Sequence, residues 1–287
     1  MNAEEDSEPI QDLKKFIYQL LYMDNGAVTM NDSESLKWAY ECLEGIFQPY
    51  QFELQQYVTN DEGLQRYIDA NLDEKTPSQV KLLGLCWDRV SDTLSTKKME
   101  LDGSASTKRQ ILRSIASQYD VYNFNGPLLN RSRLFLHDLQ YNKMLGWDDK
   151  LSPELVREWQ NITKQINAAP VIEVKRFDGK RNSSYRLIAF TDSSKQIYGT
   201  VVYIQDIETN LVSFLPAPNR IVNKQLEMKS VPSLEFLAVS FGTEVLAELY
   251  QELCGDSCIK PIKVVDMHLY SDSFVSFMAQ CMSQQIG

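Results

Sequence analysis

Three carboxylates lie at the ends of predicted secondary-structure elements in the last third of the chain. Asp192 follows a strand-like segment, Glu235 lies one turn into a long helical pattern, and Asp272 ends a further strand-like segment. Carboxylate oxygens are the ligands that Mg²⁺ prefers, and a cluster of unpaired carboxylates is costly unless a cation neutralises it. Each acid also has an ordinary role: Asp192 can cap a turn, Glu235 suits a first helical turn, and Asp272 can cap the next helix. Residue type alone leaves both interpretations open.

A further carboxylate, Asp24, lies in a predicted hairpin near the N-terminus. Apolar segments flank Asp24-Asn25-Gly26, and Asn-Gly between β-prone segments is the strongest short hairpin signal. Polymerase chemistry needs two or three carboxylates around two metal ions. Because the neutral amide of Asn25 is a weaker ligand for hard cations than a carboxylate, Asp24 alone cannot hold two metals. We interpret the segment as a plain turn and predict no polymerase activity.

The five cysteines do not form a recognised metal-binding pattern. They are few, odd in number and scattered, which favours reduced thiols and opposes a disulfide framework. Cys254 and Cys258 together with His268 and Cys281 could in principle bind zinc, but their spacing matches no known zinc site. We interpret Cys254 and Cys258 as loop thiols.

Composition and charge limit the classes of function. The 287 residues suggest about two compact units, and the formal net charge of −10 opposes tight, sequence-independent binding to a polyphosphate. No apolar run is long enough to span a membrane, and the N-terminus is acidic where a secretory signal would be basic. We therefore expect an intracellular protein, in the cytoplasm or the nucleus.

The predicted elements change in character along the chain. Residues 1–9 are polar and acidic and are predicted to be disordered. In residues 10–96 we predict a hairpin, an amphipathic helix at Ser33–Phe47 and a strand at Val80–Trp87.

Residues 97–180 show helical periodicity, whereas residues 181–287 alternate strands with one long helix. The predicted helices of the first region are Thr107–Ser117, Leu128–Leu145 and Leu155–Ile166. The second region has predicted strands at Tyr185–Phe190, Ile197–Ile204, Leu211–Leu215 and Ile262–Tyr270, a helix at Leu234–Leu253 and a helix that begins at Asp272. This order is an incomplete α/β layout.

An ordered set of segments along most of the chain resembles the polyprotein of BEL/Pao-type retroelements, from the end of the reverse transcriptase to the start of the ribonuclease H domain. The segments are Tyr22-Met23-Asp24-Asn25, LGLCWDRVSDTLS, SQYDVYNFNGPLL, LGWDDKLSPELVREWQ, AFTDSSKQIYGTVVY, VPSLEFLA and LYSDSFVSFMA. The first resembles the Tyr-x-Asp-Asp hairpin of reverse transcriptase palms. The last three resemble, in order, the first two strands, the first helix, and the fourth strand with its following helix of the ribonuclease H domain.

The resemblance implies a fold, a division of the chain and a site. The fold is α/β (α+β), with a residual palm-like piece over residues 10–96, a helical thumb-like or connection-like part over 97–180, and a truncated ribonuclease H-like mixed sheet over 181–287. It also implies that Asp192, Glu235 and Asp272 converge at one edge of this sheet, as catalytic residues that bind Mg²⁺.

The chain departs from the family pattern in ways that oppose strong catalysis. The family's fourth carboxylate comes from a helix well beyond the fourth strand, whereas this sequence ends at Gly287, 15 residues after Asp272, before the last strand of the sheet. By analogy we expect a weakened site that binds at most one metal well. Loss of the two-metal arrangement would cost several kcal/mol of barrier, so we expect weak or absent hydrolysis.

These observations leave three hypotheses about function. The first is an exapted, domesticated retroelement remnant, a pseudoenzyme that binds protein or nucleic acid, with a protein partner pairing to the unfinished sheet edge. The second is a Mg²⁺-dependent ribonuclease H that cleaves the RNA of RNA/DNA hybrids, although the acidic charge disfavours the hybrid as a partner. The third is a fragment of a longer reading frame without an independent role.

Overall fold

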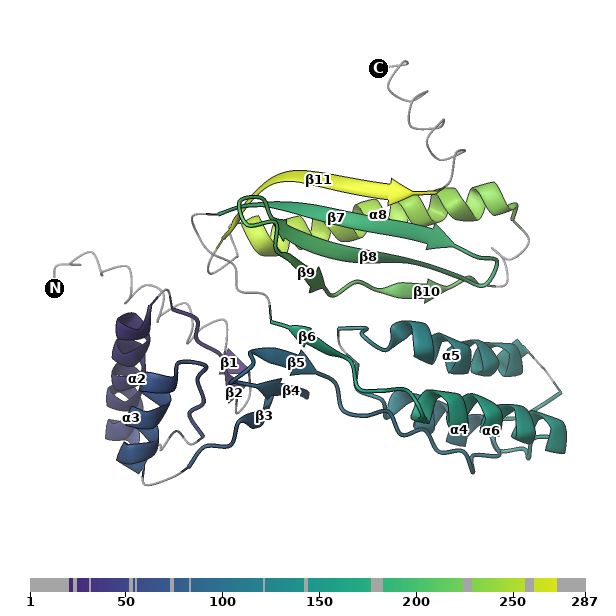
Figure 1. The fold of residues 1–287 in the computed structure, drawn as a ribbon. Coiled ribbons are helices and arrows are strands. Elements are labelled where there is room, and N and C mark those ends of the chain that lie inside the picture. The colour runs from purple at the N-terminus through teal and green to yellow at the C-terminus, as the bar shows by residue number, and fades with distance from the viewer. Residues whose placement is uncertain are drawn as a thin grey trace, which may run out of the picture. The chain divides into compact units, whose positions relative to one another are not determined.

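The structure, a computed structural model, describes two compact units, Met1–Ser95 and Thr96–Gly287 (Figure 1). The described residues are 21–22, 25–30, 32–51, 54, 56–72, 75–82, 84–120, 122–141, 144–176, 183–223, 229–255 and 261–272. Among them, no helix is long and apolar enough to cross a membrane. Each unit is described by itself below.

The first unit combines two helices with short antiparallel strands. Its elements are β1 (Leu21–Tyr22), β2 (Asn25–Gly26), α2 (Ser33–Phe47), the 3-10 helix η1 (Gln48–Tyr50), α3 (Glu62–Leu72), β3 (Gln79–Leu82), β4 (Leu85–Asp88) and β5 (Thr93–Ser95). The bounds of α2 are those predicted from the sequence, whereas α3 was not predicted. Asp32 and Asp61 precede the two helices, and each accepts a backbone N–H of the first turn, from Ser35 at 2.8 Å and Leu64 at 2.7 Å respectively.

Two strand predictions in this unit need correction. The single strand predicted at Val80–Trp87 is a hairpin of β3 and β4, because Gly84 between them adopts a φ of 84° that favours glycine and reverses the chain. The predicted N-terminal hairpin exists, but Tyr22 pairs with Asn25, so the Asn-Gly pair lies in β2. Asp24 lies outside the described residues.

Three helices make up the first part of the second unit: α4 (Lys108–Ala116), α5 (Gly126–Tyr141) and α6 (Pro153–Asn167). Thr107 and Ser152 cap α4 and α6 with their hydroxyl oxygens, and Pro153 occupies the first turn of α6. Their apolar faces meet around Trp159, which is completely buried. The strand β6 (Glu173–Lys175) follows α6.

The second part of this unit is a five-stranded mixed sheet with one long helix. Its elements are β7 (Ser184–Ser193), β8 (Ile197–Asp206), β9 (Val212–Leu215), β10 (Asn219–Ile221), α8 (Val231–Cys254) and β11 (Lys263–Ser271). The strand order is β10-β8-β7-β11, with β9 also paired to β8, and β11 runs parallel to β7 while the other pairs are antiparallel. The α+β fold class predicted from the sequence is confirmed, with a ribonuclease H-like sheet. The helix predicted from Asp272 onward lies outside the described residues, apart from Asp272 itself.

One face of this sheet packs against α8 (Figure 1). Alternate side chains of β7 and β8 share a single apolar cluster with the helix: Tyr185, Leu187, Ala189, Val202 and Ile204 meet Leu234, Ala238, Phe241 and Val245. The helix approaches β7 so closely at Gly242 that a Cβ atom there would lie 2.2 Å from Cγ2 of Thr191. The side chains that point to the other face are consequently free of α8.

The four-part division predicted from the sequence stays a prediction. The structure divides the chain after Ser95, next to the predicted boundary after residue 96. Residues 1–9 and the predicted boundary near residue 180 lie outside the described residues.

Candidate functional site

The parallel pairing of β7 with β11 brings two of the three candidate acids to the same edge of the sheet. Thr191 lies opposite Ser271 in the register of these strands, so the next residues, Asp192 and Asp272, are neighbours at the carboxyl ends of the strands. Neighbouring strands lie about 4.8 Å apart. The sheet therefore places two carboxylates side by side, and both residues are exposed.

Local hydrogen bonds hold Asp192 at the start of the β7–β8 turn. Its Oδ1 accepts the backbone N–H of Ser193 at 2.7 Å. The turn itself is closed by Ser194, whose hydroxyl oxygen accepts the backbone N–H of Ile197 at 2.9 Å and of Gln196 at 3.2 Å. Because Ser194 satisfies these donors, Asp192 is not needed to close the turn, although its carboxylate does bind the adjacent backbone.

Glu235 approaches the sheet from the helix side. It follows Leu234, which is buried against the sheet in the first turns of α8, and is itself half-buried. Thr191 faces α8 at Gly242, so strand alternation assigns the next residue, Asp192, to the opposite face. The structure thus brings Asp192 and Asp272 together and places Glu235 on the helix that covers the other face.

The described side chains do not form a closed ligand set for a metal ion. Within the described ranges, no group of three His, Cys, Asp or Glu side chains is close enough together to hold one metal. Ribonuclease H-like domains generally use Mg²⁺, which prefers six ligands in near-octahedral geometry. Two adjacent carboxylates supply only part of such a set, so the residues as placed here do not fit a complete Mg²⁺ site. The assignment of the three acids as catalytic, metal-binding residues stays a prediction.

The described residues do not support the zinc site considered from the sequence either. Cys254 is a half-buried free thiol at the end of α8, and His268 is engaged with a carboxylate on β11. Cys258 and Cys281 lie outside the described residues.

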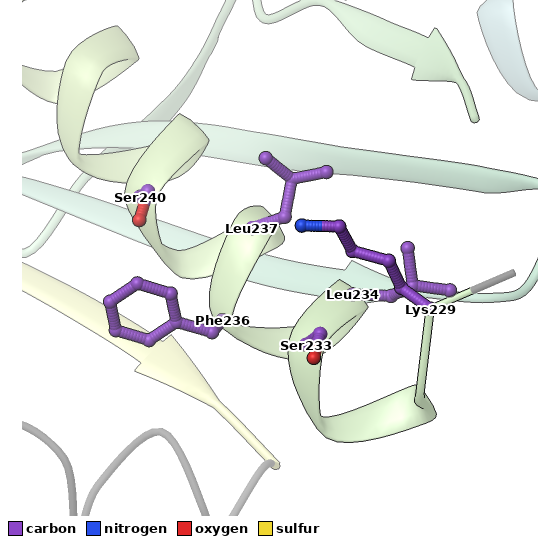
Figure 2. A pocket seen from close by; sticks show the side chains of 6 residues that line it. All are labelled: Lys229, Ser233, Leu234, Phe236, Leu237 and Ser240. Atoms are coloured by element: carbon purple, nitrogen blue, oxygen red, sulfur yellow. The ribbon is translucent and has the colours of Figure 1, made fainter. Parts of the chain in front are cut away.

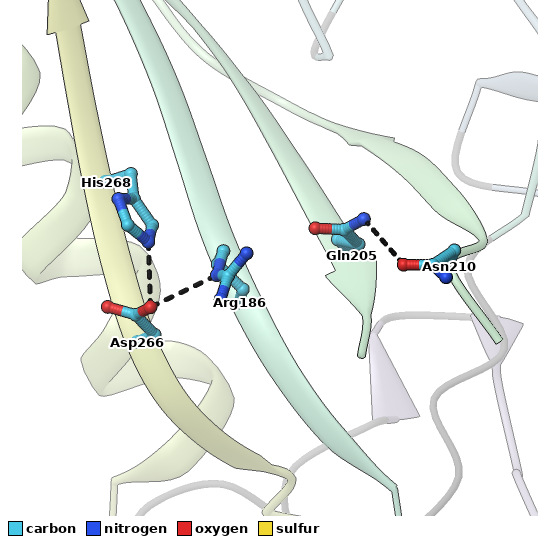
Figure 3. A network of polar contacts seen from close by, with 5 residues as sticks. All are labelled: Arg186, Gln205, Asn210, Asp266 and His268. Carbon is cyan, nitrogen blue, oxygen red and sulfur yellow. Dashed lines mark hydrogen bonds and ion pairs between the residues drawn. The ribbon is translucent and has the colours of Figure 1, made fainter. Parts of the chain in front are cut away.

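A polar network that was not predicted from the sequence lies at the opposite end of the same strands (Figure 3). One carboxylate oxygen of Asp266, Oδ2, lies 2.7 Å from Nε2 of His268 and accepts a hydrogen bond from Nε of Arg186 at 3.1 Å. His268 and then Arg186 lower the pKa of Asp266 below its usual value. The signal for this network was present in the sequence, since Asp266 and His268 are two residues apart in a predicted strand and so share one face.

Aromatic rings fill the same face between the two ends. Tyr270 stacks on Phe190 with ring centroids 5.3 Å apart and an interplanar angle of 21°. Phe190 then contacts Tyr203 edge-on at 6.2 Å, and Tyr203 contacts Phe214 edge-on at 6.0 Å. From Asp266 to Asp272, this face therefore changes from a charged network, through a row of rings, to a pair of acids.

A shallow depression lies on the first turns of α8 rather than at Asp192 and Asp272 (Figure 2). It has a volume of about 190 Å³ and is lined by Lys229, Ser233, Leu234, Phe236, Leu237 and Ser240. Because its lining is largely apolar and contains no carboxylate, it offers no chemistry for a metal or for phosphate hydrolysis.

Solved structures of foamy viral enzymes resemble the chain over most of its length. The protease-reverse transcriptase in complex with double-stranded DNA is 10% identical, with a TM-score of 0.48 over 89% of this chain and 54% of that chain. The same enzyme in complex with RNA/DNA hybrid is also 10% identical, with a TM-score of 0.47 over 90% of this chain and 36% of that chain. The chain thus spans about half, or less, of these proteins. No curated protein sequence matches it significantly.

A protein-family comparison agrees with the sheet topology and with the resemblance seen in the sequence. The family described as the Pao retrotransposon-like RNaseH-like domain matches residues 107–273, which is more than half of the chain. The matched range includes the three helices α4, α5 and α6, the mixed sheet and all three candidate acids. The chain therefore belongs to the Pao retrotransposon-like RNaseH-like domain family and carries the ribonuclease H region of a retroelement polyprotein.

Proposed function

We propose that this ribonuclease H-like domain of retroelement origin hydrolyses RNA/DNA hybrids weakly or not at all, and that it acts as a binding module for protein or nucleic acid. The observation that carries the proposal is the arrangement of the acids. Asp192 and Asp272 are neighbours, whereas Glu235 comes from the helix on the opposite face of the sheet. A two-metal mechanism needs more carboxylate oxygens in one place than this arrangement supplies.

The absence of polymerase activity is part of the same proposal. Asn25 stands where the resembled Tyr-x-Asp-Asp hairpin has its second aspartate. An amide oxygen carries no negative charge and binds hard divalent cations less strongly than a carboxylate does.

Charge supports weak binding of a hybrid. The chain has a net charge of −10, and two cations of the helical part are used within the fold. The buried Lys108 donates to the carbonyl oxygen of Leu145 at 2.6 Å, and Arg109 donates to both carboxylate oxygens of Asp148, at 2.8 and 2.9 Å. Phosphate contacts depend on free lysine and arginine side chains, so we expect a low affinity for hybrid and, because few phosphates are contacted, an affinity that falls only shallowly as salt is added.

An exapted, intracellular role completes the proposal. The few, scattered cysteines support a reducing compartment, whether cytoplasm or nucleus. The edge of β11 could take a strand from a protein partner, since β11 is the last strand of the described sheet order.

Hydrolysis and binding of a labelled RNA/DNA hybrid, measured separately in Mg²⁺ and Mn²⁺, test the proposal. We compare the wild-type chain with Asp192→Asn and Asp272→Asn, and use Asp206→Asn as a matched control. Asp206 lies at the opposite end of β8, where its carboxylate accepts the N–H groups of Glu208 and Thr209. We expect hydrolysis slower than that of an intact two-metal site by a factor of ~1,000 or more, equivalent to several kcal/mol of barrier.

The alternative function is a Mg²⁺-dependent ribonuclease H, and the adjacency of Asp192 and Asp272 at the strand ends favours it. Rapid hybrid cleavage that both Asn substitutions at these positions abolish, and that Asp206→Asn leaves intact, would establish the alternative and exclude the non-catalytic proposal. Binding that is unchanged while cleavage is lost would then assign these residues to catalysis rather than to substrate affinity.

A further inference from the structure

The face of the sheet that points away from α8 carries an exposed apolar surface. We call it the outer face and define its apolar centre by six residues: Ile188, Phe190, Val201, Tyr203, Phe214 and Tyr270. The strand register places Tyr270, Phe190 and Val201 in one row across β11, β7 and β8. The next row holds His268, Ile188, Tyr203 and Phe214. The outer face is thus continuous across four strands, and at β9 its residue Phe214 packs against Phe124, with ring centroids 5.4 Å apart.

Much of this surface is in contact with solvent. Phe190 and Tyr270 are each 50% exposed, and Val201 in the same row is 40% exposed. Contiguous apolar side chains on a protein surface mark sites of interaction. The outer face therefore has the composition of a protein interface.

The ring geometry favours a protein partner over nucleic acid. Bases bind to aromatic residues by stacking on exposed ring faces. Here Tyr270 and Phe190 stack on each other, and Tyr203 contacts both Phe190 and Phe214 edge-on. Because the rings cover one another's faces, they offer edges to solvent, which suits interdigitation with side chains of another apolar surface.

Charged groups lie at both ends of the apolar centre. Asp192 and Asp272 occupy the carboxyl ends of β7 and β11, and Arg186 lies six residues before Asp192 on β7. This separation along the strand is about 20 Å. Arg186 binds Asp266 through Nε, and no described hydrogen bond uses its two terminal nitrogens. A guanidinium has five N–H donors, so Arg186 can still bind a second carboxylate.

We propose that the outer face pairs with the outer face of a second copy of this chain, with Arg186 of each copy opposite Asp192 of the other. The two-fold axis lies between the two sheets, perpendicular to the strands, at the level between Ile188 and Phe190. The strands of the two copies then run in opposite directions. The end of β7 that carries Arg186 in one copy therefore faces the end that carries Asp192 in the other. An isologous interface requires such a self-complementary surface. Two sheets packed face to face, as in a β-sandwich, bury the row of rings between them.

This inference goes beyond the proposed function and rests on it, because a carboxylate of Asp192 that pairs with an arginine of the second copy does not hold a catalytic metal. It also accounts for two neighbouring carboxylates without a metal. Like charges side by side on a sheet repel each other, and the single guanidinium of the second copy, which also binds Asp266 of its own chain, offsets part of that repulsion.

Sedimentation velocity of the full chain over a range of micromolar concentrations tests the proposal. We expect a concentration-dependent dimer in the wild type. Phe190→Asp should raise the dissociation constant by about 30-fold or more, the effect of losing a central interface side chain. The matched control is Phe236→Asp, since Phe236 is 52% exposed but lies on α8, away from the outer face. Val201→Lys provides a second variant if Phe190→Asp does not fold.

A charge exchange tests the two-fold arrangement itself. Arg186→Asp and Asp192→Arg should each weaken the dimer by roughly tenfold, and the chain with both substitutions should recover most of the wild-type affinity. A wild-type chain that stays monomeric, a dimer that Phe190→Asp does not weaken, or a double variant no better than the single ones would each overturn the proposal. Hybrid cleavage is measured in parallel. A monomer that does not cleave hybrid would overturn this inference alone, whereas rapid cleavage would overturn the proposed function.

Discussion

The unit that ends at Ser95 and the unit that begins at Thr96 bury very different amounts of apolar side chain. The second unit contains two large clusters, one around Trp159 and one between the sheet and α8. The first contains two small clusters, around Leu43 and around Ile68. Since apolar burial is the main favourable term in folding, the first unit depends more on its polar interactions.

A buried glutamine supplies much of that polar stabilisation in the first unit. Gln65 is almost completely buried in α3. Its Oε1 accepts the backbone N–H of Thr59 at 2.8 Å, and its Nε2 donates to Oδ1 of Asp69 at 2.8 Å and to Oγ1 of Thr76 at 2.9 Å. The second unit also has buried hydrogen bonds, such as that from Asn125 to Thr96 at 2.8 Å, but they accompany two much larger apolar clusters. The second unit should therefore be sensitive to lost volume, and the first to lost hydrogen bonds.

Trp159→Ala should be the most destabilising substitution and should act on the second unit. The indole is completely buried, packs on Phe135 at 5.7 Å and donates to the carbonyl oxygen of Asp102 at 2.8 Å. We expect a loss of about 3–5 kcal/mol in the free energy of unfolding. Urea unfolding combined with hydrogen exchange of each unit measures it. Trp147→Ala, at a site 42% exposed, is the control and should cost much less.

Gln65→Leu should be the most damaging single change to the polar network of the first unit. Leucine fills similar volume but leaves the buried N–H of Thr59 without its acceptor and removes the hydrogen bonds to Asp69 and Thr76, which keep the bond to each other. We expect a loss of about 2–3 kcal/mol, seen as faster hydrogen exchange in α3 with no change in the second unit. Gln79→Leu, on an exposed strand residue, is the control. Equal effects of the two substitutions would contradict a special role for Gln65.

The sequence predicted the second unit better than the first for a physical reason. The strands β7, β8 and β11 and the helix α8 are long, so their periodicity is averaged over many residues. In the first unit, α3 was missed because its buried residues include Gln65, a polar residue that breaks the apolar pattern. The strands β3 and β4 were merged because a three- or four-residue alternation is too short to show the turn at Gly84.

The candidate site was predictable only in part. Sequence order and the family pattern placed Asp192 and Asp272 at the ends of two strands, and the register makes them neighbours. The side of the sheet on which each acid lies depends on strand alternation and on the close approach of α8 at Gly242. The network of Asp266, His268 and Arg186 joins strands 80 residues apart, and such a pairing cannot be read from local spacing.

Two glycine substitutions in helices should change stability in opposite directions. In the second unit, a Cβ at Gly242 would meet Cγ2 of Thr191 at 2.2 Å, so Gly242→Ala should cost about 1–3 kcal/mol and displace β7, the strand that carries Asp192. In the first unit, a Cβ at Gly45 has nothing within 4 Å. Gly45→Ala in α2 should therefore stabilise by about 0.5–1 kcal/mol, because alanine is the better helix former. Thermal unfolding of both variants checks the signs.

The weakest of these effects should be on the pH dependence of the first unit. Hydrogen bonds from Gln65 and then from Thr76 lower the pKa of Asp69 in the folded chain. The ionised form is therefore favoured by folding, so this contribution is present above the ordinary aspartate pKa of about 3.9 and is lost as the pH falls through the lower, folded value. We expect Asp69→Asn to reduce the loss of stability between about pH 5 and about pH 3. Urea midpoints at the two pH values measure it.

A matched control for this prediction lies in the same helix. Glu62→Gln removes one negative charge from an exposed residue in the first turn of α3. If the hydrogen bonds of Asp69 set the acid stability of this unit, Asp69→Asn should flatten the pH dependence more than Glu62→Gln does. If both substitutions reduce the pH dependence equally, the loss of one negative charge, rather than the hydrogen bonds of Asp69, is responsible. The acid stability of the first unit would then no longer support the contrast between a polar first unit and an apolar second unit.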